Sequence, residues 1–233
     1  YPWYKFEEYP DKYSCWWGVD VLPETEETTP SYMDFVFRSE DSVMKTWLKA
    51  GISGWRLDVA DELPPLFLKS FWQELKKTNK DAILIGEVWE DASNKISYGE
   101  QRAYLCGGQL DSVMNYVMRN LMLDFLRGYA DANLTNQRIL HQMENYPLEN
   151  FYAMLNLVGS HDVERVLTML ADEQADVAPK RLCLLWTWQM TMPGAPCVYY
   201  GDEVGVEGFK DPDNRRTYPW GRENKQLLSW CRK

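Results

Sequence analysis

From Asp41 onward, short apolar runs alternate with longer stretches whose apolar residues recur at helical spacing. The apolar runs predict five strands, and the helical stretches predict a helix before or after each of them. The strands are expected within 51–62, 82–89, 109–116, 156–162 and 195–200, and the helices at 42–50, 66–78, 119–129, 133–145 and 179–192. Strands separated by helical crossovers pair in parallel, so the pattern predicts an α/β fold.

The length of the chain can be compared with the length of a complete parallel α/β barrel. A complete eight-stranded (β/α)8 barrel takes about 250 residues, but these 233 residues supply only five strands because several connections are long. Residues 1–40 are rich in Trp, Tyr, Pro and Glu and show little periodicity. We interpret them as the tail of a loop or lobe inserted before the fourth barrel strand, and 41–233 as strands 4 to 8 with their helices, the C-terminal part of a TIM barrel.

Three carboxylates stand at the C-terminal ends of predicted strands: Asp58, Glu87 and Asp162. This is the edge at which a β/α barrel carries its active site. Arg56 lies two residues before Asp58, and strand residues two apart share a face, so the guanidinium is expected to hold that carboxylate ionised. The three acids therefore predict an active site.

Composition narrows the class of ligand. The chain has 35 acidic and 25 basic residues, a net charge of −10, and no Lys/Arg cluster that would follow a phosphate backbone. Nucleic acid is therefore not expected as a partner. The 11 Trp and 14 Tyr residues suit stacking on sugars as well as packing in a core.

The cysteines and the hydrophobic runs indicate whether the chain has disulfides, a zinc site or a membrane span, and in which compartment it is expected. The five cysteines are scattered and odd in number, which argues against a disulfide framework and against a zinc site. No run approaches the roughly 18 to 20 apolar residues of a membrane span, and no signal peptide opens the chain. The chain begins Tyr-Pro-Trp-Tyr without Met, as an excised piece would. We expect a cytoplasmic protein with no membrane partner, although secretion stays open.

Three motifs in order carry a family resemblance: Gly-Trp-Arg-Leu-Asp ending at Asp58, Gly-Glu-Val-Trp around Glu87, and Ser-His-Asp ending at Asp162. They resemble the second, third and fourth sequence regions of the α-amylase family, glycoside hydrolase family 13. Tyr-Tyr-Gly-Asp-Glu at 199–203 and Asp-Pro-Asp-Asn-Arg-Arg at 211–216 extend the likeness. It is closest to the neopullulanase, cyclomaltodextrinase and maltogenic amylase group.

The resemblance implies a retaining hydrolase that cleaves α-1,4 or α-1,6 glucosidic bonds in maltooligosaccharides, cyclodextrins, pullulan or starch. Asp58 would be the nucleophile that forms a glycosyl-enzyme, and Glu87, with a raised pKa, the general acid/base. Asp162 would bind sugar hydroxyls and stabilise the transition state. Arg56 would keep Asp58 charged.

The resemblance also implies substrate contacts for five further residues. His161 would donate to a sugar hydroxyl, and Asp211 with Arg215 would hold the non-reducing side of the glucan. Trp89 is interpreted either as a stacking platform for the acceptor sugar or as a wall of the pocket. Glu62 would touch the acceptor side, or lie on a solvated rim. Asp202 and Glu203 are expected to cap a helix after the last strand instead of binding substrate.

Other interpretations remain open on the residues alone. Arg56 and Asp58 would also suit a structural ion pair, and His161 a core histidine. The same acids would serve an α-glucan transglycosylase or sugar isomerase, while a non-catalytic glucan-binding protein would be expected to have lost one of them. No cofactor or metal is expected from these residues. The first sequence region of the resembling family has no counterpart here, and the usual calcium ligands come largely from that absent region. Calcium therefore stays open for the full-length protein but cannot be assigned to residues of this chain.

Without the first three strands, the sheet of such a barrel has exposed edges that pair readily with a second copy. We therefore predict that the isolated chain has little or no activity and self-associates. Sedimentation velocity tests the second expectation, and a stable monomer at micromolar concentration contradicts it.

Overall fold

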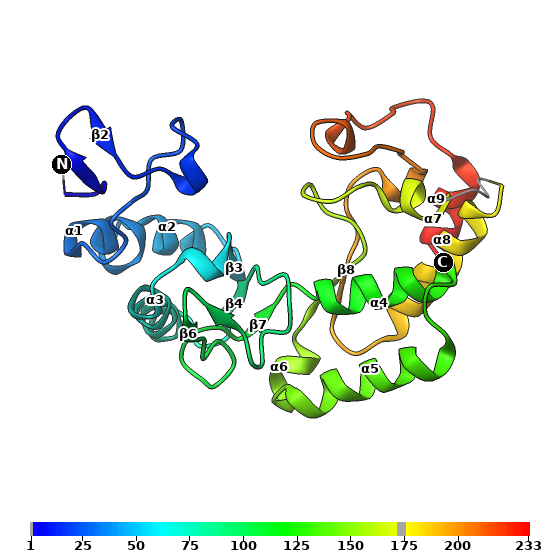
Figure 1. Cartoon of the computed structure of the whole chain (residues 1–233), viewed down its shortest axis with the longest axis horizontal. Coiled ribbons are helices and arrows are strands. Elements are labelled where there is room, and N and C mark those ends of the chain that lie inside the picture. Colours follow the sequence, from blue (N-terminus) through cyan, green and yellow to red (C-terminus); the bar gives the residue numbers. More distant parts are fainter. Residues whose placement is uncertain (1, 172–175) are drawn as a thin grey trace. The chain divides into compact units, whose positions relative to one another are not determined.

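The computed structural model describes residues 2–171 and 176–233. It divides into two compact units. The first, called the N-unit below, comprises 1–87 and 96–111, and the second, the C-unit, comprises 88–95 and 112–233. Each unit is described by itself (Figure 1).

The N-unit contains a parallel strand pair, two small hairpins and several helices (Figure 1). Its strands are β1 (Phe6–Glu8), β2 (Lys12–Tyr13), β3 (Gly54–Leu57), β4 (Ile83–Gly86), β5 (Ile96–Ser97) and β6 (Glu100–Gln101). Its helices are η1 (Trp16–Gly18), α1 (Pro30–Met33), the π-helix η2 (Asp34–Arg38), α2 (Val43–Lys49), η3 (Ala60–Glu62) and α3 (Pro65–Thr78).

The parallel pair of β3 and β4 is the central feature of the N-unit. Its register runs from Gly54 opposite Ile83 to Leu57 opposite Gly86. The approach is close, because a Cβ on Gly54 would lie 2.2 Å from the carbonyl oxygen of Ile83. The two strands therefore end level with each other.

Helix α3 contributes most of the apolar core of the N-unit. Pro65 stands in its first turn, where a missing N–H costs nothing. Phe67 and Phe71 lie on its buried face and contact the fully buried Phe37 of η2, with ring centroids 5.5 and 5.2 Å apart. Aromatic packing thus connects the segment before β3 to the crossover helix between β3 and β4.

The C-unit contains the parallel pair of β8 and β9 surrounded by helices (Figure 1). Its strands are β7 (Ser112–Val113), β8 (Leu155–Leu157) and β9 (Ala195–Cys197). Its helices are α4 (Tyr116–Arg127), α5 (Ala132–Asn145), α6 (Leu148–Tyr152), α7 (Val166–Ala171), α8 (Ala178–Thr191), η4 (Asp202–Val204), η5 (Asp213–Arg215) and α9 (Lys225–Cys231).

Local signals set the ends of α4 and α5. The Asn115 side chain accepts from the backbone N–H of Met118 at 3.1 Å, and that of Asp131 from Leu134 at 2.8 Å, which are N-cap hydrogen bonds. Gly128 ends α4 at φ 84°, in the left-handed region that glycine adopts without steric cost. The apolar faces of α4, α7 and α8 then form one buried cluster.

A chain of buried amides runs through the C-unit from helix to strand. Gln142 of α5 donates to the Asn115 side chain at 2.9 Å, and Asn115 donates to Asn156 of β8 at 2.8 Å. Gln189 of α8, fully buried, donates from Nε2 to the carbonyls of Asn156 at 2.7 Å and Cys197 at 3.0 Å. These hydrogen bonds hold α8 against both β8 and β9.

The predicted elements are present, with one or two residues of difference at most helix ends and shorter strands. The five predicted strands appear as β3, β4, β7, β8 and β9. The expected parallel pairing is found for β3 with β4 and β8 with β9. The pattern gave no indication of α1 and η2 within residues 1–40, or of α7 directly after the Ser-His-Asp motif. Across residues 2–171 and 176–233, no helix combines the length and apolar character that crossing a membrane needs.

Replacing Gln189 tests the role of the buried amide. We expect Gln189→Leu to lower the free energy of unfolding by roughly 1–3 kcal/mol, because two backbone acceptors lose their donor in the interior. Urea unfolding followed by circular dichroism measures this. Gln137→Leu, on the exposed side of α5, is the matched control. Equal midpoints for the two variants contradict the prediction.

Candidate active site

The register of β3 and β4 places two carboxylates side by side. Leu57 lies opposite Gly86, so Asp58 and Glu87, the next residues, follow the two strands at the same level. The Glu87 N–H donates to the Leu57 carbonyl at 2.9 Å, and the Ala60 N–H donates to the Glu87 carbonyl at 3.0 Å. The backbone thus fixes both acids at one edge.

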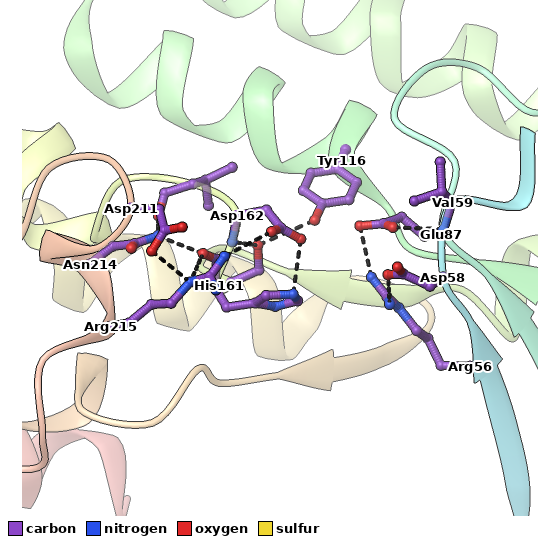
Figure 2. Close-up of polar contacts among 12 residues, drawn as sticks. Arg56, Asp58, Val59, Glu87, Tyr116, His161, Asp162, Asp211, Asn214 and Arg215 are labelled. Atoms are coloured by element: carbon purple, nitrogen blue, oxygen red, sulfur yellow. Dashed lines mark hydrogen bonds and ion pairs between the residues drawn. The ribbon is translucent and has the colours of Figure 1, made fainter. Parts of the chain in front are cut away.

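Arg56 contacts both carboxylates with different nitrogens (Figure 2). Its Nη1 pairs with Asp58 Oδ1, and its Nη2 lies 2.7 Å from Glu87 Oε1. The predicted pair of Arg56 with Asp58 is therefore present, and Glu87 joins it. A guanidinium suits this position because its planar nitrogens address two acceptors at once.

The two acids differ sharply in exposure. The Asp58 side chain is 71% exposed, whereas that of Glu87 is 2% exposed. One carboxylate is thus open to solvent or ligand, and the other is enclosed by protein. Different surroundings for two neighbouring carboxyl groups are what acid and nucleophile roles require.

Val59 orients the buried acid through its backbone. Its N–H donates to Glu87 Oε2 at 3.0 Å. Val59 has φ 38°, in the left-handed region that a β-branched residue rarely adopts. Such strain is retained where the surrounding structure needs the conformation, as at functional sites.

A second polar cluster lies in the C-unit, after β8. His161 Nε2 lies 3.1 Å from Asp162 Oδ2, and Arg215 Nη2 lies 3.4 Å from Asp162 Oδ1. Arg215 Nε lies 3.2 Å from Asp211 Oδ1. Four of the predicted site residues, His161, Asp162, Asp211 and Arg215, therefore contact one another (Figure 2).

The buried Asn214 fixes the loop that carries Arg215. Its Nδ2 donates to the carbonyls of His161 at 2.7 Å and Val163 at 2.8 Å. The Arg215 Nε also donates to the His161 carbonyl, at 3.0 Å. This loop is consequently held directly to the Ser-His-Asp motif.

Arg165 fixes the same loop through a second set of contacts. Its side chain is fully buried and donates to the Asn214 carbonyl at 2.7 Å and to the Tyr200 carbonyl. It also pairs with Asp202 Oδ1 at 3.0 Å, and its guanidinium lies 4.1 Å from the ring centroid of Tyr199. One cation thus joins the start of α7, the segment after β9 and the loop of Asn214.

Asp202 was expected to cap a helix, and that expectation is wrong. The short helix η4 has Gly201 as its N-cap and no side-chain cap, while the Asp202 side chain turns inward to Arg165. Burial raises the pKa of the Asp202 carboxyl to about 7, against the opposing hydrogen bond and charge of Arg165. The cap interpretation failed because the sequence does not reveal the buried arginine.

Trp89 has a ring partner in the C-unit. It stacks on Tyr116 with centroids 4.1 Å apart and planes 10° apart, and it remains 41% exposed. The Tyr116 hydroxyl lies 3.2 Å from Ser160 Oγ, which accepts from the Asp162 N–H at 3.2 Å. The exposed indole is therefore connected through Tyr116 to the loop of Asp162.

Glu62, the remaining predicted residue, lies in η3 of the N-unit. It accepts a hydrogen bond from the Tyr98 hydroxyl. Tyr98 is one of the residues that sequence reasoning missed, along with Val59, Arg165, Asn214 and Tyr116. Some indication of Asn214 and Arg165 was present in the sequence, since Asn214 lies within the motif at 211–216 and Arg165 lies close after the Ser-His-Asp motif. No feature of the sequence indicated the backbone role of Val59.

Comparison with known proteins identifies the family to which this chain is similar. Residues 5–229 match the family model described as alpha amylase, catalytic domain. The chain is 38% identical to the amylopullulanase of Thermoanaerobacter thermohydrosulfuricus, a match that covers 99% of this chain and 17% of that protein. It is 36% identical to a cyclomaltodextrinase of a Bacillus species, with 94% and 40% covered. The chain thus spans less than half of these relatives.

A solved hydrolase structure is also similar to this chain. The cyclic α-maltosyl-(1→6)-maltose hydrolase of Arthrobacter globiformis, in complex with cyclic α-maltosyl-(1→6)-maltose, superimposes with a TM-score of 0.85 at 31% identity. The match covers 99% of this chain and 50% of that one.

The raised pKa of Asp202 predicts a pH-dependent stability. A folded pKa near 7, above the ordinary value of about 4, means that this group favours folding below pH 4 and loses that contribution as pH rises to 7. Asp202→Asn removes the titration. We expect the free energy of unfolding of the unsubstituted chain to fall relative to Asp202→Asn between pH 4 and 7. Urea titrations across this range measure the difference, and a constant difference contradicts the assignment.

Proposed function

The chain belongs to the α-amylase catalytic-domain family, and from this premise we propose that it carries the reacting groups of a retaining glycosidase. The substrates are α-1,4 or α-1,6 glucosidic bonds in maltooligosaccharides, cyclodextrins, pullulan or starch. The names of its relatives, amylopullulanase and cyclomaltodextrinase, support this class. In this proposal β3, β4, β7, β8 and β9 are strands 4 to 8 of a (β/α)8 barrel.

The observation that carries the proposal is the arrangement of Arg56 between an exposed Asp58 and a buried Glu87. A retaining mechanism needs one carboxylate as nucleophile and a second carboxyl group that supplies a proton. Arg56 pairs with Asp58 and orients it, and the Val59 N–H donates to the second oxygen of Glu87. The side chain that must reach the anomeric carbon is the one that is exposed.

The first chemical step forms an ester. An Asp58 carboxylate oxygen attacks the anomeric carbon as the glycosidic C–O bond breaks, and the departing oxygen takes the proton of Glu87. In the second step a water attacks the same carbon, Glu87 takes the proton of that water, and the ester bond to Asp58 breaks. Two inversions leave the configuration unchanged. The reaction uses only these carboxyl groups and water, so no cofactor takes part.

The cluster after β8 supplies the substrate contacts in this proposal. Asp162 accepts hydrogen bonds from hydroxyls of the reacting sugar and stabilises its positive charge, while His161 donates to a hydroxyl. Arg215 and Asp211 hold the non-reducing side of the glucan. The ion pairs among these four residues support such a role, because they fix the orientation of each donor and acceptor before substrate arrives.

Trp89 and Glu62 complete the proposed acceptor side. The Trp89 indole is exposed and backed by Tyr116, which gives a rigid platform for a pyranose ring. Glu62 offers carboxylate oxygens to sugar hydroxyls. A transglycosylase or sugar isomerase would use the same ester and differ in the acceptor that attacks it. A non-catalytic glucan-binding protein would use only the contacts.

Replacement of the two acids tests the chemistry. In the longest natural protein that contains this chain, we expect Asp58→Asn and Glu87→Gln each to reduce sugar release from maltotriose, β-cyclodextrin and pullulan by about a thousandfold or more, through loss of nucleophile or proton donor. Chromatography of the products measures the rates and identifies the linkage cleaved.

Asp81→Asn, at an exposed turn before β4, is the matched control and should keep the parent rate. Circular dichroism verifies that all variants are folded. Sugar release by the parent that survives both acid substitutions contradicts the assigned roles. Binding of glucan by the parent without release of sugar favours the non-catalytic alternative.

A further inference from the structure

The buried Arg102 of the N-unit contacts the turn that follows the proposed nucleophile. It comes directly after β6 and is 7% exposed. Its Nη2 donates to the carbonyl of Ala60 at 3.1 Å and to that of Leu63 at 2.5 Å. Burial of a charged group is unfavourable unless hydrogen bonds compensate for it, and here main-chain carbonyls accept them. The contacts of this arginine are therefore concentrated on the backbone of the turn 59–63.

The two carbonyls lie at opposite ends of η3. Ala60 is the first residue of η3 and is fully buried, and Leu63 is its C-cap. The N–H of Ala60 donates to the Glu87 carbonyl at 3.0 Å. One nitrogen of Arg102 thus holds both ends of a turn whose backbone also binds Glu87.

This turn begins with the strained Val59. Its backbone is left-handed, with φ 38° and ψ 64°, and in this conformation its N–H donates to Glu87 Oε2 at 3.0 Å (Figure 2). A β-branched residue stays in that region only where the surrounding structure determines its conformation. Arg102 supplies such a constraint, because it fixes the carbonyls of two residues that follow Val59.

Tyr104 adds a side-chain contact to the same turn. It is fully buried, and its hydroxyl donates to Asp61 Oδ1. The Arg102 guanidinium lies 5.1 Å from the centroid of its ring. Burial, together with the hydrogen bond to Asp61, raises the pKa of the Tyr104 phenol, so the hydroxyl keeps the proton that it donates.

The segment that carries Arg102 is itself fixed to β4. The Leu110 N–H donates to the Tyr104 carbonyl at 3.1 Å. The Asp111 N–H donates to the Leu84 carbonyl at 2.9 Å, and the Asp111 side chain accepts from the Leu84 N–H at 2.7 Å. The guanidinium therefore acts from a segment held to the strand that ends at the proposed general acid.

We propose that Arg102 is a positioning residue for Glu87: it keeps the turn 59–63 in the conformation in which the Val59 N–H binds the Glu87 carboxyl group. The inference rests on the proposed function, which makes Glu87 the proton donor. Without Arg102, we expect Val59 to relax toward an ordinary backbone conformation. Glu87 then loses a hydrogen-bond donor and its orientation toward the departing oxygen.

Substrates that differ in their need for a proton test this role. The glucan is whichever of maltotriose, β-cyclodextrin and pullulan the parent cleaves fastest, and its leaving oxygen requires the proton of Glu87. The fluoride of α-maltosyl fluoride departs without that proton, and kcat/KM reports the first step with either substrate. In the longest natural protein that contains this chain, we expect Arg102→Met to lower kcat/KM by about tenfold to a hundredfold for the glucan and by less than about threefold for the fluoride.

A conservative variant and two references accompany this measurement. Arg102→Lys keeps the charge and a donor on a shorter side chain, so the glucan-selective loss should shrink to about threefold to tenfold. It also decides the matter if circular dichroism shows that Arg102→Met is unfolded. Glu87→Gln gives the pattern expected when the proton donor is lost. Arg38→Met, which removes an exposed arginine of η2, is the matched control and should leave both values unchanged.

A loss that is selective for the glucan supports the inference. An equal loss on both substrates indicates a merely structural role and overturns it, as do unchanged values in the folded Arg102 variants. Both of these outcomes are read against a parent that cleaves the glucan, so they leave the proposed function intact. A parent that cleaves none of the three glucans contradicts the proposed function, and this inference with it.

Discussion

The parallel register of β3 and β4 is the constraint on which the proposed chemistry depends. Because Leu57 lies opposite Gly86, the carboxylates that follow them come from different strands yet stand at one edge. A slip by one residue would turn Asp58 or Glu87 to the other face. The close approach of Gly54 to Ile83 and of Gly86 to Leu110 leaves no room for a side chain at either glycine. The two glycines thus fix the relation between the two proposed reacting groups.

Arg56 connects the two acids that this register places at one edge. Two carboxylates side by side repel each other, and a single guanidinium between them removes the repulsion while leaving one acid exposed and the other enclosed. Lysine would offer only one nitrogen for the same task. The arginine of the Gly-Trp-Arg-Leu-Asp motif is therefore as much a part of the acid pair as the aspartate that follows it.

Sequence reasoning succeeded where a local pattern determines the result. Helices such as 66–78 and 133–145 carry apolar residues at helical spacing, and the acids mark strand ends, so both were predicted. It failed where the cause lies far along the chain. Asp202 was interpreted as a cap because Arg165, its partner 37 residues away, cannot be recognised as buried from the sequence. The left-handed backbone of Val59 likewise has no signal in a β-branched residue.

The contacts of Arg165 affect when the second polar cluster, His161, Asp162, Asp211 and Arg215, forms during folding. The loop of Asp211 and Arg215 has only the short helix η5 of its own, and its position comes from Arg165 and from the carbonyls of His161 and Val163. Those contacts join segments about fifty residues apart, whereas Val59 and Glu87, which bring the two strand ends together, are 28 residues apart. Closing a long loop costs entropy before its contacts form. We therefore expect the second polar cluster, with its proposed substrate contacts, to form later in folding than the contact between the ends of β3 and β4.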